Sequence, residues 1–191
     1  MIRSDITIRP ETPADFPVIN ELVRRAFAEH TSYSNGESEV ALIEELRRSR
    51  YYKPDLAFVA LLNGQIVGHF MFTDFPLSPM PQGGYDPNAK TDLLMLAPVA
   101  VHADYYRQGI GETMLRKGLE IAKALDYKGI NVEGDPNFYN RFGFVTSTVF
   151  HIHATGGFPL ENPACMMVQE CRPGSLSGVS GYIVYDMYEN A

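Results

Sequence analysis

The sequence predicts an α/β fold built on a mixed sheet, and three observations support this prediction. Two β-rich runs, residues 56–62 and 65–72, are separated by Asn63-Gly64, a strong signal for a tight hairpin with antiparallel strands. Residues 93–101 are almost entirely apolar, as expected of a strand buried on both faces. An amphipathic helix links this run to a strand at residues 129–133, and such a crossover makes the two strands parallel.

The N-terminal elements follow from periodicity and capping signals. Residues 6–9 alternate as in a short strand, and Thr12-Pro13 is typical of a helix N-cap followed by proline at the first helical position. Apolar residues then recur at helical spacing to about residue 28, and residues 40–48 form a second amphipathic helix that ends before Pro54.

The remaining segments show shorter patterns. Residues 73–92 carry four prolines without periodicity and are expected to form a long loop. The helix after the apolar strand is expected to end near residue 126, and Asp135-Pro136 starts a short helix that Gly143 closes. Two apolar runs, residues 166–171 and 182–185, predict strands in the C-terminal part.

Length and composition are typical of a globular protein without a membrane partner. The 191 residues predict one domain over residues 1–191, with a core at 6–150 and a strand-rich extension at 151–191. Apolar residues make up 45% of the chain and charged residues 20%, with a mean hydropathy of −0.15. No run reaches the roughly 18 apolar residues of a membrane helix, and the first residues lack the pattern of a signal peptide. We therefore expect a cytoplasmic protein.

Charge and cysteine content exclude further classes. A net charge of −7 argues against nucleic-acid binding, which requires clustered Lys and Arg. The acidity favours solubility and is weakly compatible with a cationic substrate. Cys165 and Cys171 are the only cysteines, and on one strand they would lie about 20 Å apart, beyond the reach of a disulfide. Two free thiols are expected.

The segment that joins the apolar strand to the next helix predicts an anion site. Gly109 and Gly111 let the backbone approach a ligand closely, and the unpaired N–H groups of the new helix favour negative charge. A P-loop is excluded because no Gly-x-x-x-x-Gly-Lys-Ser/Thr occurs, and Met114 stands where a dinucleotide fingerprint needs its third glycine. The turn therefore fits a pyrophosphate bound by a motif that is neither a P-loop nor a dinucleotide fingerprint.

Two ordered motifs identify a family. The turn Arg107-Gln-Gly-Ile-Gly111 in its strand-turn-helix resembles the acetyl-CoA-binding core of the GCN5-related N-acetyltransferases (GNAT). Tyr139-Asn-Arg-Phe-Gly-Phe144, one helix and one strand later, resembles the Tyr-x-x-x-Gly-Phe segment of that family. Gly134-Asp-Pro and residues 178–181 further resemble its YhbS-like branch, so the resemblance spans the chain.

The resemblance implies a fold and a cofactor site. The fold would be a mixed, mostly antiparallel central sheet with helices on both faces and one splayed parallel strand pair. Backbone groups of residues 99–101 would pair with the pantetheine arm, and the turn would bind the pyrophosphate. The cofactor-binding residues would be Val99, Ala100, Val101, Tyr106, Arg107, Gln108, Gly109, Ile110, Gly111, Glu112, Thr113 and Phe138.

The resemblance also implies direct transfer of an acetyl group to an amine of a small molecule or peptide. Tyr139 would be the general acid that protonates the coenzyme thiolate, and Glu133 would be the base, directly or through a water. Two plainer interpretations stay open. Tyr139 is also explained as a core aromatic residue beside Phe138, and Glu133 as a solvated side chain or a cap of the following helix.

Several alternatives remain at this point. The family usually has Gln or Arg where Tyr106 stands, which favours a non-catalytic acyl-CoA-binding sensor or regulatory module as the alternative function. Another acyl group, or a protein N-terminus as acceptor, is a further possibility. His151 and His153 would share one face of a strand, but two ligands make no metal site, so no metal is expected. His69 and His102 are expected to be packed or solvated. An apolar C-terminal strand is compatible with a homodimer.

Overall fold

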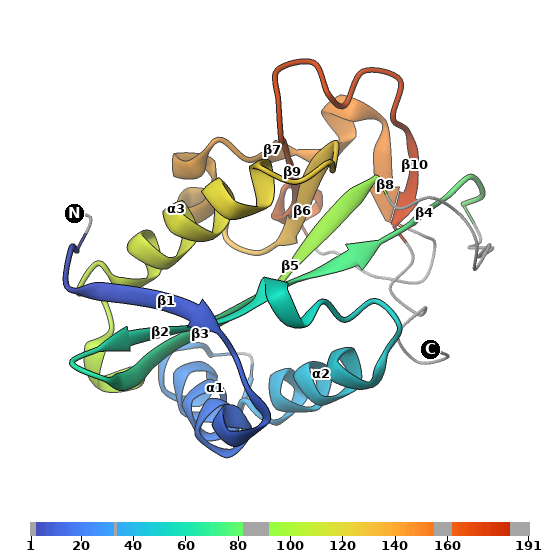
Figure 1. Cartoon of the computed structure of the whole chain (residues 1–191). Coiled ribbons are helices and arrows are strands. Elements are labelled where there is room, and N and C mark those ends of the chain that lie inside the picture. The colour runs from blue at the N-terminus through green and yellow to red at the C-terminus, as the bar shows by residue number, and fades with distance from the viewer. Residues whose placement is uncertain (1–2, 33, 82–91, 155–161, 184–191) are drawn as a thin grey trace. The chain divides into compact units, whose positions relative to one another are not determined.

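The computed structural model describes residues 3–32, 34–81, 92–154 and 162–183. The chain folds into two units, the first comprising residues 1–73 and 96–120 and the second residues 74–95 and 121–191. Strand β5 (Leu93–Val101) and helix α3 (Ile110–Lys123) each contribute residues to both units (Figure 1).

The first unit contains an antiparallel meander of β1 (Ile6–Pro10), β2 (Ala57–Leu62) and β3 (Gln65–Phe75). Asn63 and Gly64 have φ angles of 51° and 80°, and a two-residue type I′ turn requires positive φ at both positions. The hairpin predicted from these two residues is confirmed.

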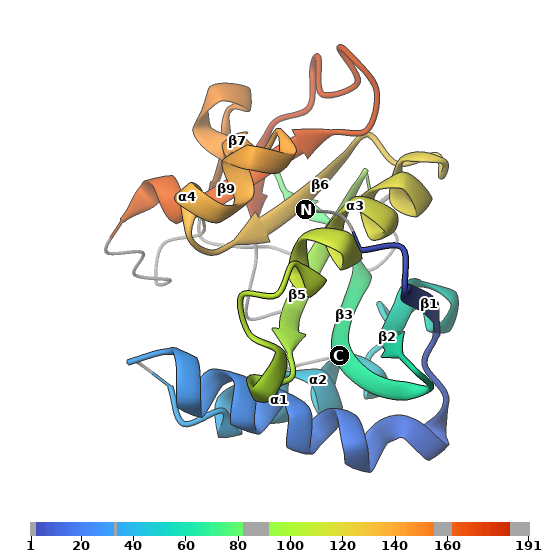
Figure 2. The same ribbon diagram turned by 90° about the vertical axis from the view of Figure 1, so that its left-hand side faces the viewer.

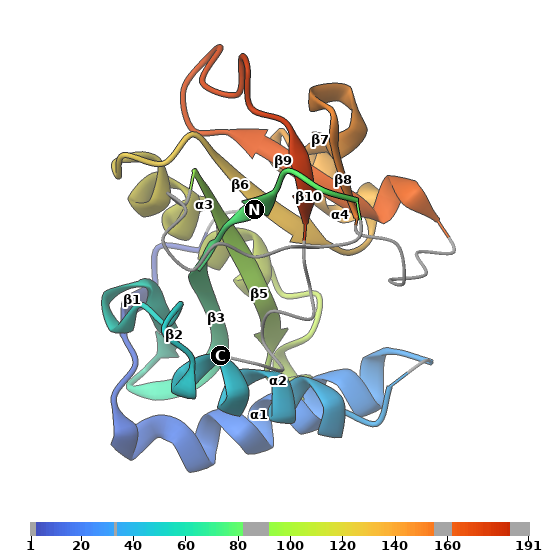
Figure 3. The same ribbon diagram turned by 90° about the vertical axis from the view of Figure 1, so that its right-hand side faces the viewer.

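Helices α1 (Phe16–His30) and α2 (Glu37–Arg48) lie side by side on one face of this meander (Figures 2 and 3). A short 3-10 turn, η1 (Pro13–Asp15), precedes α1. The Asp15 carboxylate accepts hydrogen bonds from the Thr12 N–H at 2.8 Å and the Thr12 hydroxyl at 2.9 Å, which fixes the predicted helix start. The apolar stripe that predicted α1 is buried, at Ile19, Leu22, Val23 and Ala26.

The opposite face of the meander is covered by α3, as Gly68 and Gly118 show. A Cβ on Gly68 would lie 2.3 Å from Met114 Sδ, and one on Gly118 would lie 2.4 Å from the Phe70 ring. Both glycines therefore allow close packing of β3 against the helix. His69 points to the other face, where it meets Glu11. Helices on both faces of the sheet agree with the predicted fold class.

In the second unit, the first residues of β5 pair in parallel with β6 (Gly129–Glu133). Strand β9 (Met166–Glu170) pairs antiparallel with β6 and with β7 (Val145–Thr146). The described ladder between β5 and β6 ends at Met95 and Asn131. The parallel pair predicted from the helical crossover is thus confirmed, and the pairs β1–β2, β2–β3, β6–β9 and β7–β9 of the same sheet are antiparallel.

The predicted short helix of the second unit is α4 (Pro136–Tyr139), continued by the 3-10 turn η4 (Asn140–Phe142). Gly143 closes it with a φ of 92°, in the left-handed region that favours glycine. Further short elements are η5 (Ser147–Phe150), β8 (Ile152–Ala154) and η6 (Pro163–Cys165).

A small sheet of β4 (Leu77–Ser78), β10 (Gly181–Ile183) and β8 completes the second unit (Figure 3). The loop predicted at residues 73–92 is wrong in its first part, because β3 continues to the fully buried Phe75 and β4 follows. The apolar residues Phe75 and Leu77, together with the backbone pairing of β4 with β10, outweigh the tendency of the prolines to break a strand. Residues 82–91 and 184–185 lie outside the described residues.

Both cysteine thiols are free, as expected: Cys165 ends η6 and Cys171 directly follows β9. Among the described residues, no helix has the length and apolar character needed to cross a membrane.

Candidate functional site

The turn between β5 and α3 presents a row of backbone donors. It contains a 3-10 turn, η3 (Ala103–Tyr105), and then two residues with positive φ, Arg107 at 59° and Gly109 at 80°. Within the described part of the chain, no acceptor is recorded for the backbone N–H groups of residues 107–111. Such consecutive N–H groups at a helix N-terminus form a site for an anion.

The start of α3 is held by Thr113. Its N–H and its hydroxyl both donate to the Gly109 carbonyl, at 3.1 and 3.0 Å, and its hydroxyl accepts the Arg3 N–H at 2.9 Å. The Thr113 side chain is buried and engaged in fixing the turn. Glu112 pairs instead with Arg116 at 3.1 Å, along the helix surface.

Side chains of the turn itself point to solvent. Tyr106 is 45% exposed, and the Arg107 guanidinium lies 5.5 Å from the centre of its ring. Gln108 donates to the Asp104 carbonyl at 3.1 Å, which closes the turn on itself. Ile110 is buried below the turn.

Strand β5 changes character along its length. Residues 93–97 are buried, whereas Pro98, Val99 and Val101 are only half-buried, with Ala100 buried between them. The expectation of a strand buried on both faces therefore holds only for its first half. Pro98 lacks an N–H and cannot donate to a neighbouring strand, so a proline inside the apolar run is the signal for an incomplete ladder here.

In the second unit, Glu133 is the last residue of β6 and Tyr139 is the last residue of α4, the short helix that follows. Glu133 ends the strand and is exposed, and the next residue, Gly134, donates its N–H to the Cys165 carbonyl at 3.0 Å. Asp135 caps α4, because its carboxylate accepts the Asn137 N–H at 2.9 Å. This N-cap agrees with the prediction for Asp135.

Tyr139 is held by a tight aromatic cluster. Its ring lies edge-on to Phe138 at 5.1 Å and to Phe144 at 5.8 Å between ring centres, and only 9% of the residue is exposed. A Cβ on Gly134 would lie 2.4 Å from the Tyr139 ring. The ring therefore lies directly against the backbone of residue 134, where glycine alone leaves room for it.

The predicted site residues thus form two groups. Residues 99–113 belong to the first unit, and Glu133, Phe138 and Tyr139 belong to the second. Within each unit the structure brings the predicted residues together, on one turn and its flanking elements in the first and around α4 in the second.

The charge environment of Cys165 reflects the acidic neighbours of Tyr139. Burial and, next, the carboxylates of Glu133 and Asp135 raise the pKa of the Cys165 thiol. A raised pKa keeps the sulfur protonated and a poor nucleophile.

The two histidines considered for a metal do not both lie on a strand. β8 begins at Ile152, and His151 precedes it with a left-handed φ of 55°, so the expected shared strand face does not form. In the described ranges, no group of three potential metal-ligating residues occurs.

A buried polar cluster in the first unit was not predicted as such. The Glu11 carboxylate accepts hydrogen bonds from Arg47 at 2.8 and 3.0 Å, from Tyr52 at 2.8 Å, and contacts His69 Nε2 at 2.9 Å. Glu11 and His69 have fully buried side chains. No local motif could reveal this cluster, because its members come from the residue after β1, from α2, from the loop after α2 and from β3.

The ionisation of Glu11 is set by its partners. Burial, the largest single influence, raises its pKa, but the hydrogen bonds from His69 and Arg47 and the charge of Arg47 outweigh burial and lower the pKa to about 2. Burial lowers the pKa of His69 against the opposing hydrogen bond with Glu11. Burial and, next, the hydrogen bond to the Glu11 carboxylate raise the pKa of Tyr52.

Comparisons with known proteins bear on the turn and on Tyr139 together. A sequence profile described as the acetyltransferase (GNAT) family matches residues 19–144. The chain is 29% identical over 184 residues to the uncharacterized N-acetyltransferase YhbS of Escherichia coli strain K12, covering 96% of this chain and 98% of YhbS. It is 27% identical over 169 residues to the uncharacterized N-acetyltransferase YjhQ of the same strain, covering 86% and 85%.

Solved structures agree. The crystal structure of YhbS from Escherichia coli in complex with CoA matches with a TM-score of 0.77 and 26% identity, over 98% of this chain and 93% of that one. A GNAT family acetyltransferase from Brucella melitensis in complex with acetyl-CoA matches with a TM-score of 0.61 and 29% identity, over 74% and 84%. The resemblance drawn from the two sequence motifs is confirmed, and the chain belongs to the GNAT family of acetyltransferases.

Proposed function

We propose that this protein transfers an acetyl group from acetyl-CoA to an amine of a small molecule or peptide, by direct attack of the amine on the thioester. The observation that carries the proposal is the turn at residues 107–111, whose backbone N–H groups have no recorded acceptor among the described residues. The relatives named above, described in complex with CoA and with acetyl-CoA, support the same ligand class.

The residues of the turn fit the chemistry of a pyrophosphate. Five consecutive N–H groups at the start of α3 offer donors without a formal charge, and the helix dipole adds to their effect. The Arg107 guanidinium would supply the fixed positive charge. Backbone groups of Val99, Ala100 and Val101 would pair with the pantetheine arm, and a backbone donor there would polarise the thioester carbonyl.

Tyr139 is proposed as the general acid. A phenol has an ordinary pKa near that of a thiol, so it can return a proton to the departing coenzyme sulfur. The tight packing of its ring against Gly134 and Phe144 supports this role, since a proton donor works only when it is held in place. Glu133, exposed at the end of β6, is proposed to take the proton of the incoming ammonium, directly or through a water.

We propose further that residues 1–191 form one N-acetyltransferase domain that acts in the cytoplasm. An acetyl group is the expected acyl group, and a homodimer is compatible with the C-terminal strand.

The test is transfer from acetyl-CoA across a panel of amines and peptides, followed by release of free thiol, with wild type and Tyr139→Phe. We expect Tyr139→Phe to keep its affinity for CoA and to lose about a hundredfold or more in turnover, in the range of a positioned acid. Tyr182→Phe, which removes a hydroxyl from β10, serves as the matched control and should be unchanged.

The outcomes separate the alternatives. Undiminished turnover of Tyr139→Phe removes this residue from the mechanism. Tight CoA binding by wild type without transfer to any amine favours a non-catalytic acyl-CoA-binding module. No binding of CoA overturns the proposal as a whole.

A further inference from the structure

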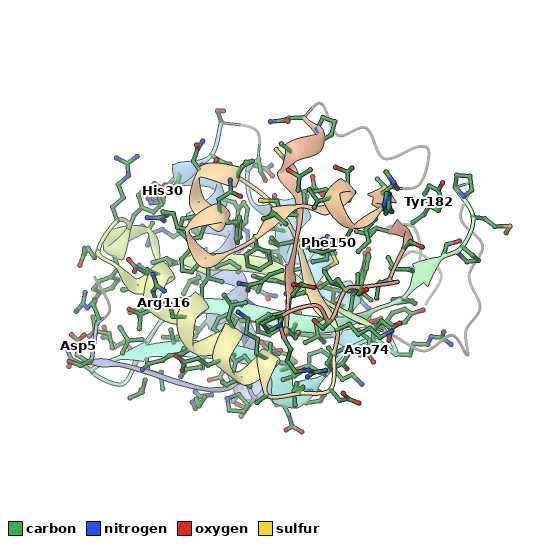
Figure 4. All side chains as sticks on the ribbon, turned by 90° about the horizontal axis from the view of Figure 1, so that it is seen from above. Asp5, His30, Asp74, Arg116, Phe150 and Tyr182 are labelled. Carbon is green, nitrogen blue, oxygen red and sulfur yellow. The ribbon has the colours of Figure 1, made fainter. Side chains whose placement is uncertain are left out.

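The last residue of α1 supports the turn of the candidate cofactor site. The ring of His30, labelled in Figure 4, lies flat on the ring of Tyr106, with centres 3.8 Å apart and planes 11° apart. His30 Nε2 also lies 3.4 Å from the Ala103 carbonyl oxygen. One side chain of α1 thus touches both the start and the end of the segment 103–106, and both partners belong to the first unit.

A second contact joins the same helix to the same segment. Arg25 donates to Asp104 at 3.2 Å and to Glu29 at 2.9 Å. The N–H of Asp104 in turn donates to His102 Nδ1 at 3.3 Å, and its carbonyl accepts from Gln108 at 3.1 Å. Figure 2 shows α1 running alongside the segment that follows β5.

Tyr106 is placed where its orientation affects the donors of the turn. It directly precedes Arg107, which holds a left-handed backbone conformation that non-glycine residues keep only when their surroundings favour it. Tyr106 is 45% exposed, so the described core does not fix its ring. The stack on His30 is the closest ring contact recorded for it.

We propose that His30 is a positioning residue for the cofactor: by stacking on Tyr106 it keeps residues 107–111 in the conformation that presents their N–H groups to the pyrophosphate of acetyl-CoA. This inference rests on the proposed function. Because His30 acts on a binding turn and not on the acid or base, its loss affects affinity for the cofactor and leaves the chemical step unchanged.

The experiment measures the Kd of CoA by calorimetry, and KM and kcat for acetyl-CoA, in wild type, His30→Ala and His30→Phe. His30→Ala should raise Kd and KM by about three- to tenfold, equivalent to about 0.7–1.4 kcal/mol, with kcat at saturation within about twofold of wild type. His30→Phe keeps a ring for the stack and should restore most of the affinity. The matched control is His153→Ala, which removes a different histidine, exposed and beside the ring of Tyr182.

A double-mutant cycle distinguishes positioning from a general loss of stability. Tyr106→Ala should weaken CoA binding, and adding His30→Ala to it should cost much less than in wild type, because the stacking contact is already gone and only the contact with the Ala103 carbonyl remains. Additive losses, or an unchanged Kd in His30→Ala, overturn the role of His30 while leaving the proposed function intact. If wild type itself binds no CoA, the cofactor site and this inference both fail.

Discussion

The protonation of His69 follows from the partners of its two ring nitrogens. Nε2 faces the Glu11 carboxylate, whereas Nδ1 is buried and has no hydrogen-bond partner among the described residues. A proton on Nδ1 would be an unsatisfied buried donor, which is costly. We therefore assign His69 as neutral, with its proton on Nε2 donated to Glu11.

This assignment predicts acid sensitivity in a defined range. The pKa of His69 is lowered in the folded protein. Below the unfolded value of about 6.5, the unfolded chain therefore binds a proton that the folded chain does not bind. The free energy of unfolding consequently decreases as the pH decreases. Glu11, with its pKa lowered to about 2, adds a second loss as pH falls below about 4.3. Thermal unfolding at pH 7, 6 and 5 should show a falling midpoint in wild type.

The variant His69→Gln isolates the first effect. Glutamine can still donate to Glu11 but does not titrate, so the midpoint should change much less between pH 7 and 5. An equal fall in wild type and variant would show that other groups cause the acid sensitivity.

Gly134 predicts a second effect at the residue scale. Because an added Cβ would lie 2.4 Å from the Tyr139 ring, Gly134→Ala must move that ring. We expect a loss of at least about tenfold in kcat with little change in the Kd of CoA, since displacement by about 1 Å has effects of this order. In a Tyr139→Phe background the same substitution should cost no further turnover, and a full additional loss there would contradict the argument.

Single residues were predictable where one residue type is required by the backbone. Gly109, Gly143 and Asn63-Gly64 all have the positive φ that their turn signals indicate. The partner of His69 was not predictable, because Glu11 lies 58 positions away and becomes a neighbour only when β1, β2 and β3 pair.

At the scale of elements, Arg47 anchors α2 to the sheet. Its guanidinium binds Glu11 and lies 3.7 Å from the centre of the Phe16 ring, and its side chain is only 7% exposed. Replacing it with methionine would fill much of the space but leave the buried Glu11 carboxylate without its counter-charge, held only by Tyr52 and His69.

We therefore expect Arg47→Met to lower the free energy of unfolding by about 3–5 kcal/mol, the usual cost of breaking one side of a buried ion pair. The adjacent Arg48, exposed on the same turn of α2, is the matched control, and Arg48→Met should change stability by less than about 0.5 kcal/mol. Urea titration measures both. Equal effects would show that the buried pair does not anchor the helix.

Elements with strong periodicity or turn signals were predicted well. The run at Leu93–Val101 and the strand Gly129–Glu133 have the predicted bounds, because an apolar run ends at a charged or polar residue on each side. Strand β4 was missed, since two residues carry no pattern and its partner β10 lies about a hundred positions later.

At the scale of the whole chain, direct transfer predicts that no cysteine takes part. Cys171 is 7% exposed and burial raises its pKa, as it does for Cys165, so neither thiol has the lowered pKa of a reactive cysteine. The double variant Cys165→Ser/Cys171→Ser should keep at least about half of the wild-type kcat. Complete loss of transfer by the folded double variant would instead indicate an acyl-cysteine intermediate.

The family and the donor side of the reaction could be predicted from the sequence, because both depend on a turn whose residues are contiguous. The acceptor could not, because no contiguous motif of the sequence indicates one. Tyr106 illustrates what the sequence can and cannot predict. Its departure from the family pattern is visible in the sequence, whereas its stacking on His30 depends on the packing of α1 beside η3.

The left-handed backbone of Arg107 has a consequence for anyone who redesigns this protein. Glycine adopts that φ without the penalty of about 1–2 kcal/mol that a side chain meets, so selection for thermal stability alone would replace the arginine. The replacement would also delete the guanidinium beside the turn that is proposed to bind the pyrophosphate. Position 107 is therefore one at which a more heat-resistant variant is expected to be a poorer binder of its cofactor.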